Sequence, residues 1–146
     1  MKKQKVTFSM IIPCYNTPIK FINRLLTSLT KQGIEKDQLQ VILVDDQSTE
    51  KEYLETAKTF EDKLNIEYVT TEGDYHTPAN TRECGLPYVK GDWLCFCDHD
   101  DMYEDNALAE IEHYIQENNP PFAICGNMRS WNEEKNEFVD FIHKQA

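Results

Sequence analysis

The sequence has no long hydrophobic run, no Cys-x-x-Cys pair and no excess of positive charge, and each absence excludes a class of protein. No apolar stretch approaches the ~20 residues that cross a bilayer. The basic start leads into a strand-like segment rather than the apolar core of a signal peptide, so we expect a cytoplasmic protein. The chain also lacks linkers, repeats and low-complexity segments, and we therefore expect residues 1–146 to form a single domain.

Acidic residues outnumber basic residues by 26 to 15, which gives a formal net charge of -11. Such a surface repels the phosphate backbone of DNA and RNA, so nucleic acid is not an expected partner. A small phosphorylated ligand would be repelled as well, unless a cation bridged it to the protein.

The sequence contains five cysteines: Cys14, Cys84, Cys95, Cys97 and Cys125. An odd number of cysteines without a secretion signal predicts reduced thiols that pack as small hydrophobic side chains. Zinc binding is the alternative, but the sequence has no Cys-x-x-Cys or His-x-x-x-His spacing that would support it.

Apolar runs alternate with amphipathic segments along most of the chain. The pattern predicts strands at 8–12, 39–44, 65–69, 93–97 and 122–125, and the first two are predicted to be buried. The segments between them predict helices, with start signals at Thr17-Pro18, Thr77-Pro78 and Asp105, and we expect Trp93, Phe96 and Met102 in the core. The region around 132–136 predicts a hairpin. Together these elements predict an α/β fold, with a mostly parallel sheet covered by helices on both faces.

Three polar clusters directly follow predicted strands: residues 13–16, Asp45-Asp46, and residues 98–101. In an open parallel sheet, ligands bind beyond the carboxyl ends of the strands. The clusters are therefore predicted to form one site.

The acidic cluster is the most informative of the three. Asp98 and Asp100 are two residues apart, so in extended backbone their side chains leave on the same side. Converging carboxylates repel one another, and Mg²⁺ or Mn²⁺ relieves that repulsion while accepting phosphate oxygens as further ligands. The alternative is a solvated acidic turn in which Asp105 caps the following helix.

The other polar residues each admit two interpretations. A carboxylate of Asp45-Asp46 could accept the ring N–H of a pyrimidine while Tyr15 stacks on that base, or these residues could serve a helix cap and a turn. Arg82 could meet a diphosphate, or form an exposed helical ion pair with a glutamate. His76 and His99 are weaker candidates, and His99 is expected to point away from the neighbouring acids.

Four segments occur in an order and spacing that resemble a known family. They are Ser-Met-Ile-Ile-Pro-Cys-Tyr-Asn at 9–16, Val-Ile-Leu-Val-Asp-Asp-Gln-Ser-Thr at 41–49, Thr-Arg-Glu-Cys-Gly at 81–85, and Gly-Asp-Trp-Leu-Cys-Phe-Cys-Asp-His-Asp-Asp at 91–101. Together they look like the N-terminal, nucleotide-binding half of a family 2 glycosyltransferase. The resemblance extends over about residues 6–128 and implies a Rossmann-like GT-A fold, of which residues 1–146 would be a single domain truncated at its C-terminus.

The resemblance also implies roles for individual residues. The nucleotide would be bound by Pro13, Tyr15, Asn16, Asp45, Asp46, Arg82 and Asp98. Asp46 would contact a uracil-type ring. Asp98 and Asp100 match the family's DxD motif and would bind Mn²⁺ or Mg²⁺, with Asp100 as the direct metal ligand.

The implied reaction transfers a sugar from a nucleotide-sugar, commonly a UDP-sugar, to an acceptor hydroxyl with inversion. The acceptor would be a glycan, a polysaccharide or a lipid-linked molecule, and the resemblance permits peripheral association with the cytoplasmic membrane face. The family's carboxylate base comes from a segment further along, and no residue of this chain matches it. A non-catalytic nucleotide- or metal-binding or interaction module is the alternative. A phosphohydrolase with Asp98 as nucleophile is a second one, which the position of the motif on the fourth predicted strand disfavours.

Overall fold

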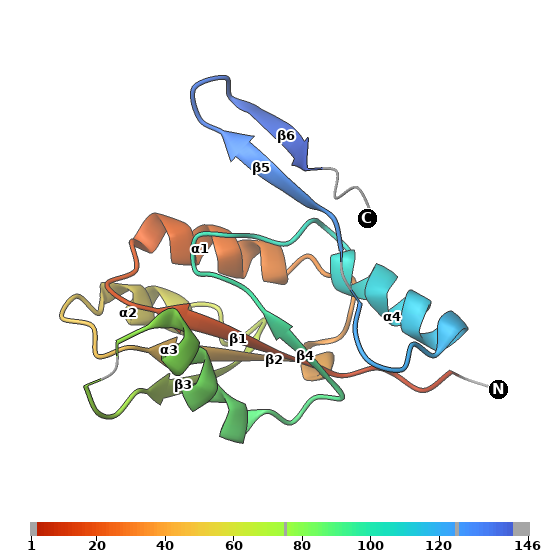
Figure 1. Ribbon diagram of the computed structural model, residues 1–146, viewed down its shortest axis with the longest axis horizontal. Coiled ribbons are helices and arrows are strands. Elements are labelled where there is room, and N and C mark those ends of the chain that lie inside the picture. The colour runs from red at the N-terminus through yellow and green to blue at the C-terminus, as the bar shows by residue number, and fades with distance from the viewer. Residues whose placement is uncertain (1–2, 75, 125, 142–146) are drawn as a thin grey trace.

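The computed structural model of the chain describes residues 3–74, 76–124 and 126–141. A layered α/β body comes first, and a two-stranded hairpin follows it near the C-terminus (Figure 1).

The body is built on a four-stranded sheet. Its strands are β1 (Phe8–Cys14), β2 (Leu39–Asp45), β3 (Asn65–Thr70) and β4 (Trp93–Phe96). They are ordered β3-β2-β1-β4, and every neighbouring pair is parallel. The predicted parallel sheet is thus confirmed, and β1 lies between the two strands that precede the acidic clusters.

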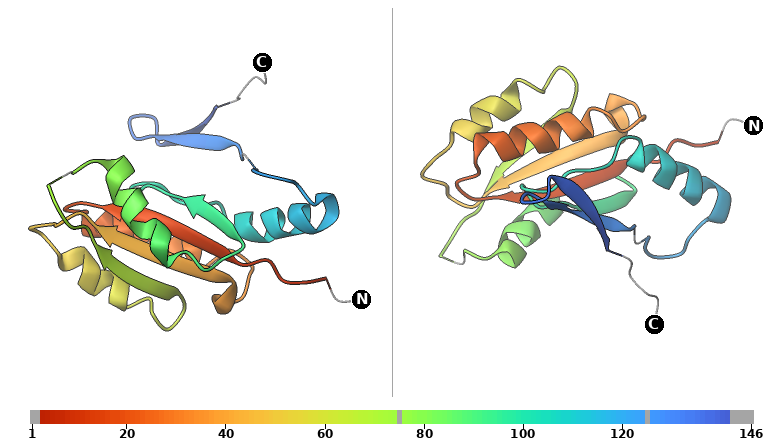
Figure 2. Two further views of the ribbon diagram at one scale, coloured as in Figure 1. Left: turned by 60° about the horizontal axis from the view of Figure 1, so that its bottom comes forward. Right: turned by 90° about the horizontal axis from the view of Figure 1, so that it is seen from above.

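Helices cover both faces of this sheet, as predicted (Figure 2). One face packs against α1 (Ile19–Leu29), α2 (Glu52–Lys58) and α4 (Ala107–Asn118), and the other packs against α3 (Pro78–Gly85). Two short 3₁₀ helices, η1 (Lys36–Gln38) and η2 (Leu86–Tyr88), complete the body.

The alternation of side chains along β1 assigns its residues to the two layers. Met10 and Ile12 are fully buried in the larger core cluster, whereas Ile11 is buried in the smaller cluster together with Ile42. On the smaller side, a Cβ added to Gly85 would meet Ile11 side-chain carbons at 3.1 Å. Glycine at this position therefore lets α3 approach the sheet closely.

Strand β1 continues through Pro13 to Cys14, two residues beyond the predicted end. Proline has no N–H to give to a sheet ladder, so it is tolerated where one side of a strand has no partner. The pairing with β4 stops at Ile11, and Pro13 is paired only with Val44 of β2. The missing N–H therefore costs no hydrogen bond, and the predicted end of the strand was wrong for this reason.

The predicted fifth strand is not present among its described residues. Residues 122–124 form no strand, and Phe122 is 89% exposed; Cys125 lies outside the described residues. Two prolines precede this apolar run, and no strand pairs with residues 122–124, so hydrophobicity alone does not make it part of the sheet.

Three further expectations were wrong. Phe96 and Met102 are 50% and 46% exposed rather than in the core, whereas Trp93 is partly buried against it. Phe96 is exposed because α3 packs mainly over β1 and β2 and leaves that face of β4 uncovered. Asn106, not Asp105, occupies the N-cap position of α4.

The predicted hairpin is confirmed. Strand β5 (Met128–Asn132) pairs in antiparallel register with β6 (Glu137–Phe141), and the rings of Trp131 and Phe138 meet edge to face. Among the described residues, no helix has both the length and the apolar character that a membrane crossing requires.

Candidate functional site

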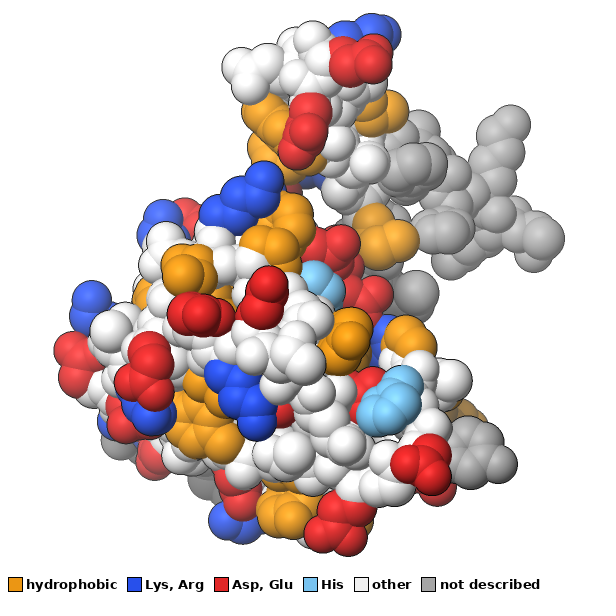
Figure 3. All heavy atoms as spheres, turned by 90° about the vertical axis from the view of Figure 1, so that its left-hand side faces the viewer, with side chains coloured by type: hydrophobic (Ala, Val, Ile, Leu, Met, Phe, Trp, Pro, Cys, Tyr) orange, Lys and Arg blue, Asp and Glu red, His pale blue; other side chains and the backbone are white. Residues whose placement is uncertain are grey.

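The carboxyl ends of β2, β1 and β4 meet at one edge of the sheet because the three strands are parallel neighbours. Figure 3 faces the left-hand side of Figure 1, where this edge lies, and acidic and histidine side chains are visible there. The three polar clusters predicted to meet are therefore brought to the same edge, with Tyr15 and Asn16 between Asp45-Asp46 and residues 98–101.

Asn16 organises the loop that follows β2. Its backbone adopts a left-handed conformation with φ of 44°, which asparagine tolerates better than most residues. Its N–H donates to Ser48 Oγ at 2.9 Å, and its Oδ1 accepts from the N–H groups of Thr49 at 2.9 Å and Glu50 at 3.0 Å. Through these hydrogen bonds, Asn16 links the end of β1 to the loop that follows β2.

Tyr15 and Pro13 lie at the end of β1 and differ in their exposure. Tyr15 is 57% exposed, so its side chain is accessible to a ligand. Pro13 is buried within β1 and supports the start of the loop.

Asp45 is a buried carboxylate whose oxygens are occupied within the protein. Tyr53 of α2 donates its hydroxyl to Oδ1 at 2.5 Å, and the N–H of Ser48 donates to Oδ2 at 3.2 Å. Lys51 lies 3.8 Å from Oδ2. Asp45 therefore holds the loop and Tyr53 of α2 in place, but it does not cap that helix, because the N-cap residue of α2 is Lys51 and no side chain caps it.

Asp46 is nearly buried as well, but it faces the loop after β3. Thr71 donates its hydroxyl to Oδ1 at 2.7 Å, and Nδ1 of His76 lies 3.1 Å from the same oxygen. The Asp46 side chain is 8% exposed and the His76 side chain 49%, so the ring lies on the solvent side of the carboxylate.

Residues 98–101 bring three carboxylates together. Oxygens of Asp98, Asp100 and Asp101 all lie within 4.8 Å of one another, and the N–H of Asp101 closes the turn by donating to the Asp98 carbonyl. Burial, reinforced by the charges of Asp100 and Asp98, raises the pKa of the Asp101 carboxyl. Three exposed carboxylates with converging oxygens are a donor set that suits a hard divalent cation such as Mg²⁺ or Mn²⁺.

Two arginines from separate helices balance this charge. Arg82 of α3 donates to Asp98 Oδ1 at 2.5 Å, so its partner is the acidic cluster rather than the glutamate considered as the alternative. Arg24 of α1 donates to the backbone carbonyl of Asp100 at 2.5 Å. The turn is thus held from both faces of the sheet.

His99 lies between the two acids of the motif, and its ring is 6.2 Å from that of Phe21 on α1. Its ring therefore packs toward α1. The described cysteines are all free thiols, as predicted, and burial raises the pKa values of Cys14 and Cys97 to about 12. These two thiols are therefore packing groups.

Two residues of this edge were not identified from the sequence: Thr71 and Arg24. Thr71 directly follows β3, so the same strand-end argument could have found it. Asp101 was part of the predicted cluster 98–101, but only Asp98 and Asp100 were assigned to the metal, whereas the structure brings all three carboxylates together. Arg24 gives no signal in the sequence, because its contact joins α1 to a turn 76 residues away.

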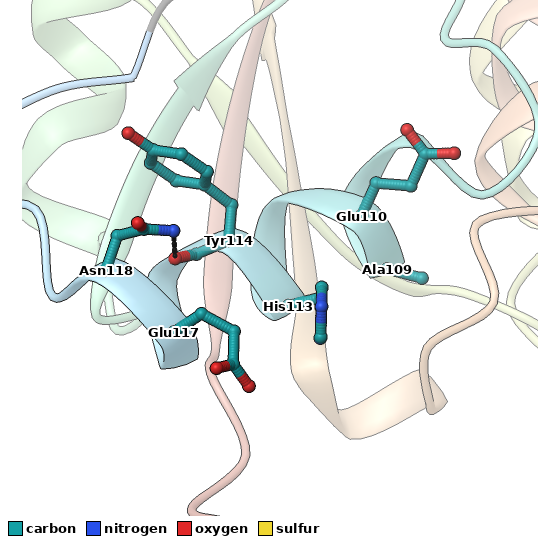
Figure 4. A pocket seen from close by; sticks show the side chains of 6 residues that line it. All are labelled: Ala109, Glu110, His113, Tyr114, Glu117 and Asn118. Atoms are coloured by element: carbon teal, nitrogen blue, oxygen red, sulfur yellow. Dashed lines mark hydrogen bonds between the residues drawn. The ribbon is translucent and has the colours of Figure 1, made fainter.

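A shallow hollow lies elsewhere, along α4, and its lining comes from one helix (Figure 4). Side chains of Glu110, His113, Tyr114 and Glu117 project separately from the helix around it. The only hydrogen bond drawn among the lining residues in Figure 4 joins Asn118 to the Tyr114 carbonyl within the helix. The lining side chains do not converge on a common point, as those at the strand edge do.

Comparison with known proteins gives consistent matches. The profile of glycosyl transferase family 2 matches residues 9–142. The poly(ribitol-phosphate) beta-N-acetylglucosaminyltransferase TarS of Staphylococcus aureus is 34% identical over 110 residues, which cover 75% of this chain and 19% of TarS. The chain thus spans about a fifth of that relative's length.

Solved structures agree. The crystal structure of S. aureus TarS 1-349 in complex with UDP-GlcNAc superposes with a TM-score of 0.71 at 33% identity, covering 77% of this chain and 32% of that one. The mannosyltransferase PcManGT from Pyrobaculum calidifontis, in complex with GDP-Man and Mn²⁺, gives a TM-score of 0.61 at 23% identity over 70% of this chain and 30% of that one. The latter is a likeness of fold, and the fold is that of GT-A glycosyltransferases.

Proposed function

The chain belongs to glycosyl transferase family 2, and we propose that it carries the nucleotide-sugar-binding part of a metal-dependent, inverting glycosyltransferase. One observation carries the proposal. The nearly buried carboxylate of Asp46 and the three-carboxylate cluster lie on either side of the end of β1, at the same edge of the sheet.

The strand order sets the size of this site. Strands β2 and β4 lie on either side of β1 and are therefore two strand spacings apart, about 10 Å. A nucleoside diphosphate can bridge that span with its base at β2 and its phosphates at β4. Tyr15, which is exposed between the two, is the stacking partner proposed for the base, and Asp46 is the acceptor proposed for a pyrimidine N–H.

The phosphates would lie over the acidic cluster. Asp98 and Asp100 would hold Mn²⁺ or Mg²⁺, and the bound cation would neutralise charge that develops on the departing diphosphate. Arg82 already contacts Asp98 and is placed to donate to a phosphate oxygen as well. Arg24 keeps the backbone of this turn in place.

The proposed reaction transfers a sugar from a UDP-sugar to a hydroxyl of a glycan, polysaccharide or lipid-linked acceptor. TarS, the relative named above, is a poly(ribitol-phosphate) beta-N-acetylglucosaminyltransferase. The residues assigned here bind and orient the donor. None of the described residues is assigned as the base that deprotonates the acceptor, and we propose that transfer takes place on the cytoplasmic side.

Thermal unfolding tests the donor site. We expect Mn²⁺ and UDP together to raise the unfolding midpoint, and each alone to change it little. At ten times the dissociation constant, a ligand stabilises the folded state by about 1.4 kcal/mol. For a domain of this size that corresponds to about 3–5 °C.

Variants test which residues produce the shift of the unfolding midpoint. D46N and D100N should each abolish most of the combined shift, whereas D62N, which removes an exposed carboxylate from the turn after α2, should leave it unchanged. A shift with Mn²⁺ alone that is insensitive to UDP would instead favour a non-catalytic metal-binding module. No shift with any combination would contradict the donor site.

A further inference from the structure

Asp46 is contacted by two side chains that come from the loop after β3. Thr71 Oγ1 and His76 Nδ1 both contact Asp46 Oδ1, at 2.7 Å and 3.1 Å. A carboxylate oxygen accepts about two hydrogen bonds, so Oδ1 is filled. Oδ2 accepts no hydrogen bond from the residues that the structure describes, and it is therefore the oxygen left for a ligand.

We propose that His76 is a positioning residue that sets the base specificity of the donor site through Asp46, an inference that rests on the proposed function. By holding Oδ1, the imidazole fixes the plane of the carboxylate and directs Oδ2 toward the N–H of a bound uracil. The contact requires a proton on Nδ1, which both the Nδ1–H tautomer and the imidazolium supply.

The surroundings of His76 support this role. Its half-exposed ring lies against a carboxylate that is 8% exposed, so it shields that group from water. Gln47, next to Asp46, donates to the carbonyl of Gly73 at 2.8 Å and ties the same loop to the end of β2. Thr77, the residue after His76, caps α3, the helix that carries Arg82. The loop thus connects the base end of the site to its phosphate end.

The expected consequence concerns the choice between uracil and cytosine. Uracil presents a donor at N3, whereas the N3 of cytosine is an acceptor and is repelled by a carboxylate oxygen. A fixed Oδ2 therefore favours UDP over CDP. Without His76 the carboxylate can turn and bind water, and we expect the preference for UDP to fall about tenfold, the size of effect of one charge-assisted hydrogen bond.

Calorimetric titration of UDP and CDP in the presence of Mn²⁺ tests the proposal on the wild-type chain, H76A and H76N. The asparagine amide can donate from a position close to that of Nδ1, so H76N should restore most of the preference that H76A loses. H113A is the control, because His113 is an exposed histidine on α4, away from the strand edge. Unfolding midpoints of all the variants verify that they fold.

The outcomes separate the inference from the proposed function. If the wild-type chain binds neither nucleotide, the donor site itself is wrong and the inference falls with it. If the wild-type chain binds UDP but does not prefer it over CDP, or H76A keeps the full preference, the donor site stands and the role of His76 is overturned. An equal weakening of UDP and CDP in H76A, or a failure of H76N to restore the preference, overturns it as well.

Discussion

Replacing Arg82 with alanine is expected to change metal binding and nucleotide binding in opposite directions. Arg82 donates to Asp98 Oδ1. Among the described residues, it is the basic side chain that forms an ion pair with the acidic cluster. A divalent ion that binds at this cluster is repelled by the guanidinium, whereas a nucleotide diphosphate is attracted by it. R82A should therefore bind Mn²⁺ more tightly and UDP more weakly than the wild-type chain.

The size of the metal effect follows from Coulomb's law. The side chains of Arg82 and Asp98 are 31% and 50% exposed, so the permittivity of water is the appropriate limit. At a separation of about 5 Å, the repulsion between a divalent ion and the guanidinium is about 1.7 kcal/mol. Physiological salt reduces it to about 0.9 kcal/mol, which corresponds to about fivefold tighter binding of Mn²⁺ by R82A.

Loss of the charge-assisted bond to a phosphate oxygen should weaken UDP binding about tenfold in the same variant. Electron paramagnetic resonance of free Mn²⁺ measures the first effect without nucleotide, and calorimetry with saturating Mn²⁺ measures the second. K58A removes the same charge from α2, where Lys58 pairs with Glu55, and should change neither. Weaker or unchanged Mn²⁺ binding by R82A would refute the electrostatic argument.

Three further predictions concern the framework of the site. Y53F removes the donor to the buried Asp45 carboxylate and should lower the free energy of unfolding by about 1.5–3 kcal/mol in urea titrations; no measurable loss would contradict the assigned contact. Burial raises the pKa values of Cys14 and Cys97 to about 12. Above pH ~9 the unfolded chain therefore loses thiol protons that the folded chain keeps. The free energy of unfolding should for this reason fall from pH 9 toward pH 12. At pH 8 their alkylation, followed by mass spectrometry, should be about a thousandfold slower than in the unfolded chain, and rapid labelling would show that these thiols are accessible. G91A would place a Cβ 2.6 Å from the backbone of β1 and should destabilise the fold by about 1–3 kcal/mol in the same urea assay, with a wild-type midpoint as the contradicting result.

Much of the fold could be predicted because the strands of a parallel sheet are continuous apolar runs. Residues 8–12 and 39–44 are recognisable in this way without knowledge of their partners, and β1 and β2 are buried along their whole length. Phe122 and Phe96 were misjudged because their burial depends on whether another element covers them, and that is decided by distant parts of the chain. The strand end at Pro13 was misjudged for the same reason, since it depends on how far β4 extends.

The candidate site divides in a similar way. The strand-end rule brought Asp46 and Asp98 to one edge, because the position of a residue after a parallel strand fixes the edge to which it belongs. It could not identify the partners of these carboxylates. His76 contacts Asp46 across 30 residues and Arg82 contacts Asp98 across 16, and neither spacing has a periodicity that a sequence displays. The sequence therefore predicts which strand end each residue follows. The hydrogen bonds that orient the side chains can be identified only from the folded structure.

Paramagnetic NMR with Mn²⁺ tests the central claim most directly, because it reports where the metal binds and whether UDP shares its site. Small additions of Mn²⁺ should broaden the amide signals of residues 98–101 first, and UDP should make this broadening occur at lower Mn²⁺ concentrations. With UDP bound, signals of the loops after β1 and β2 should also shift. Broadening centred on another acidic surface, such as η1 with its Asp37, and unaffected by UDP would contradict the proposed donor site.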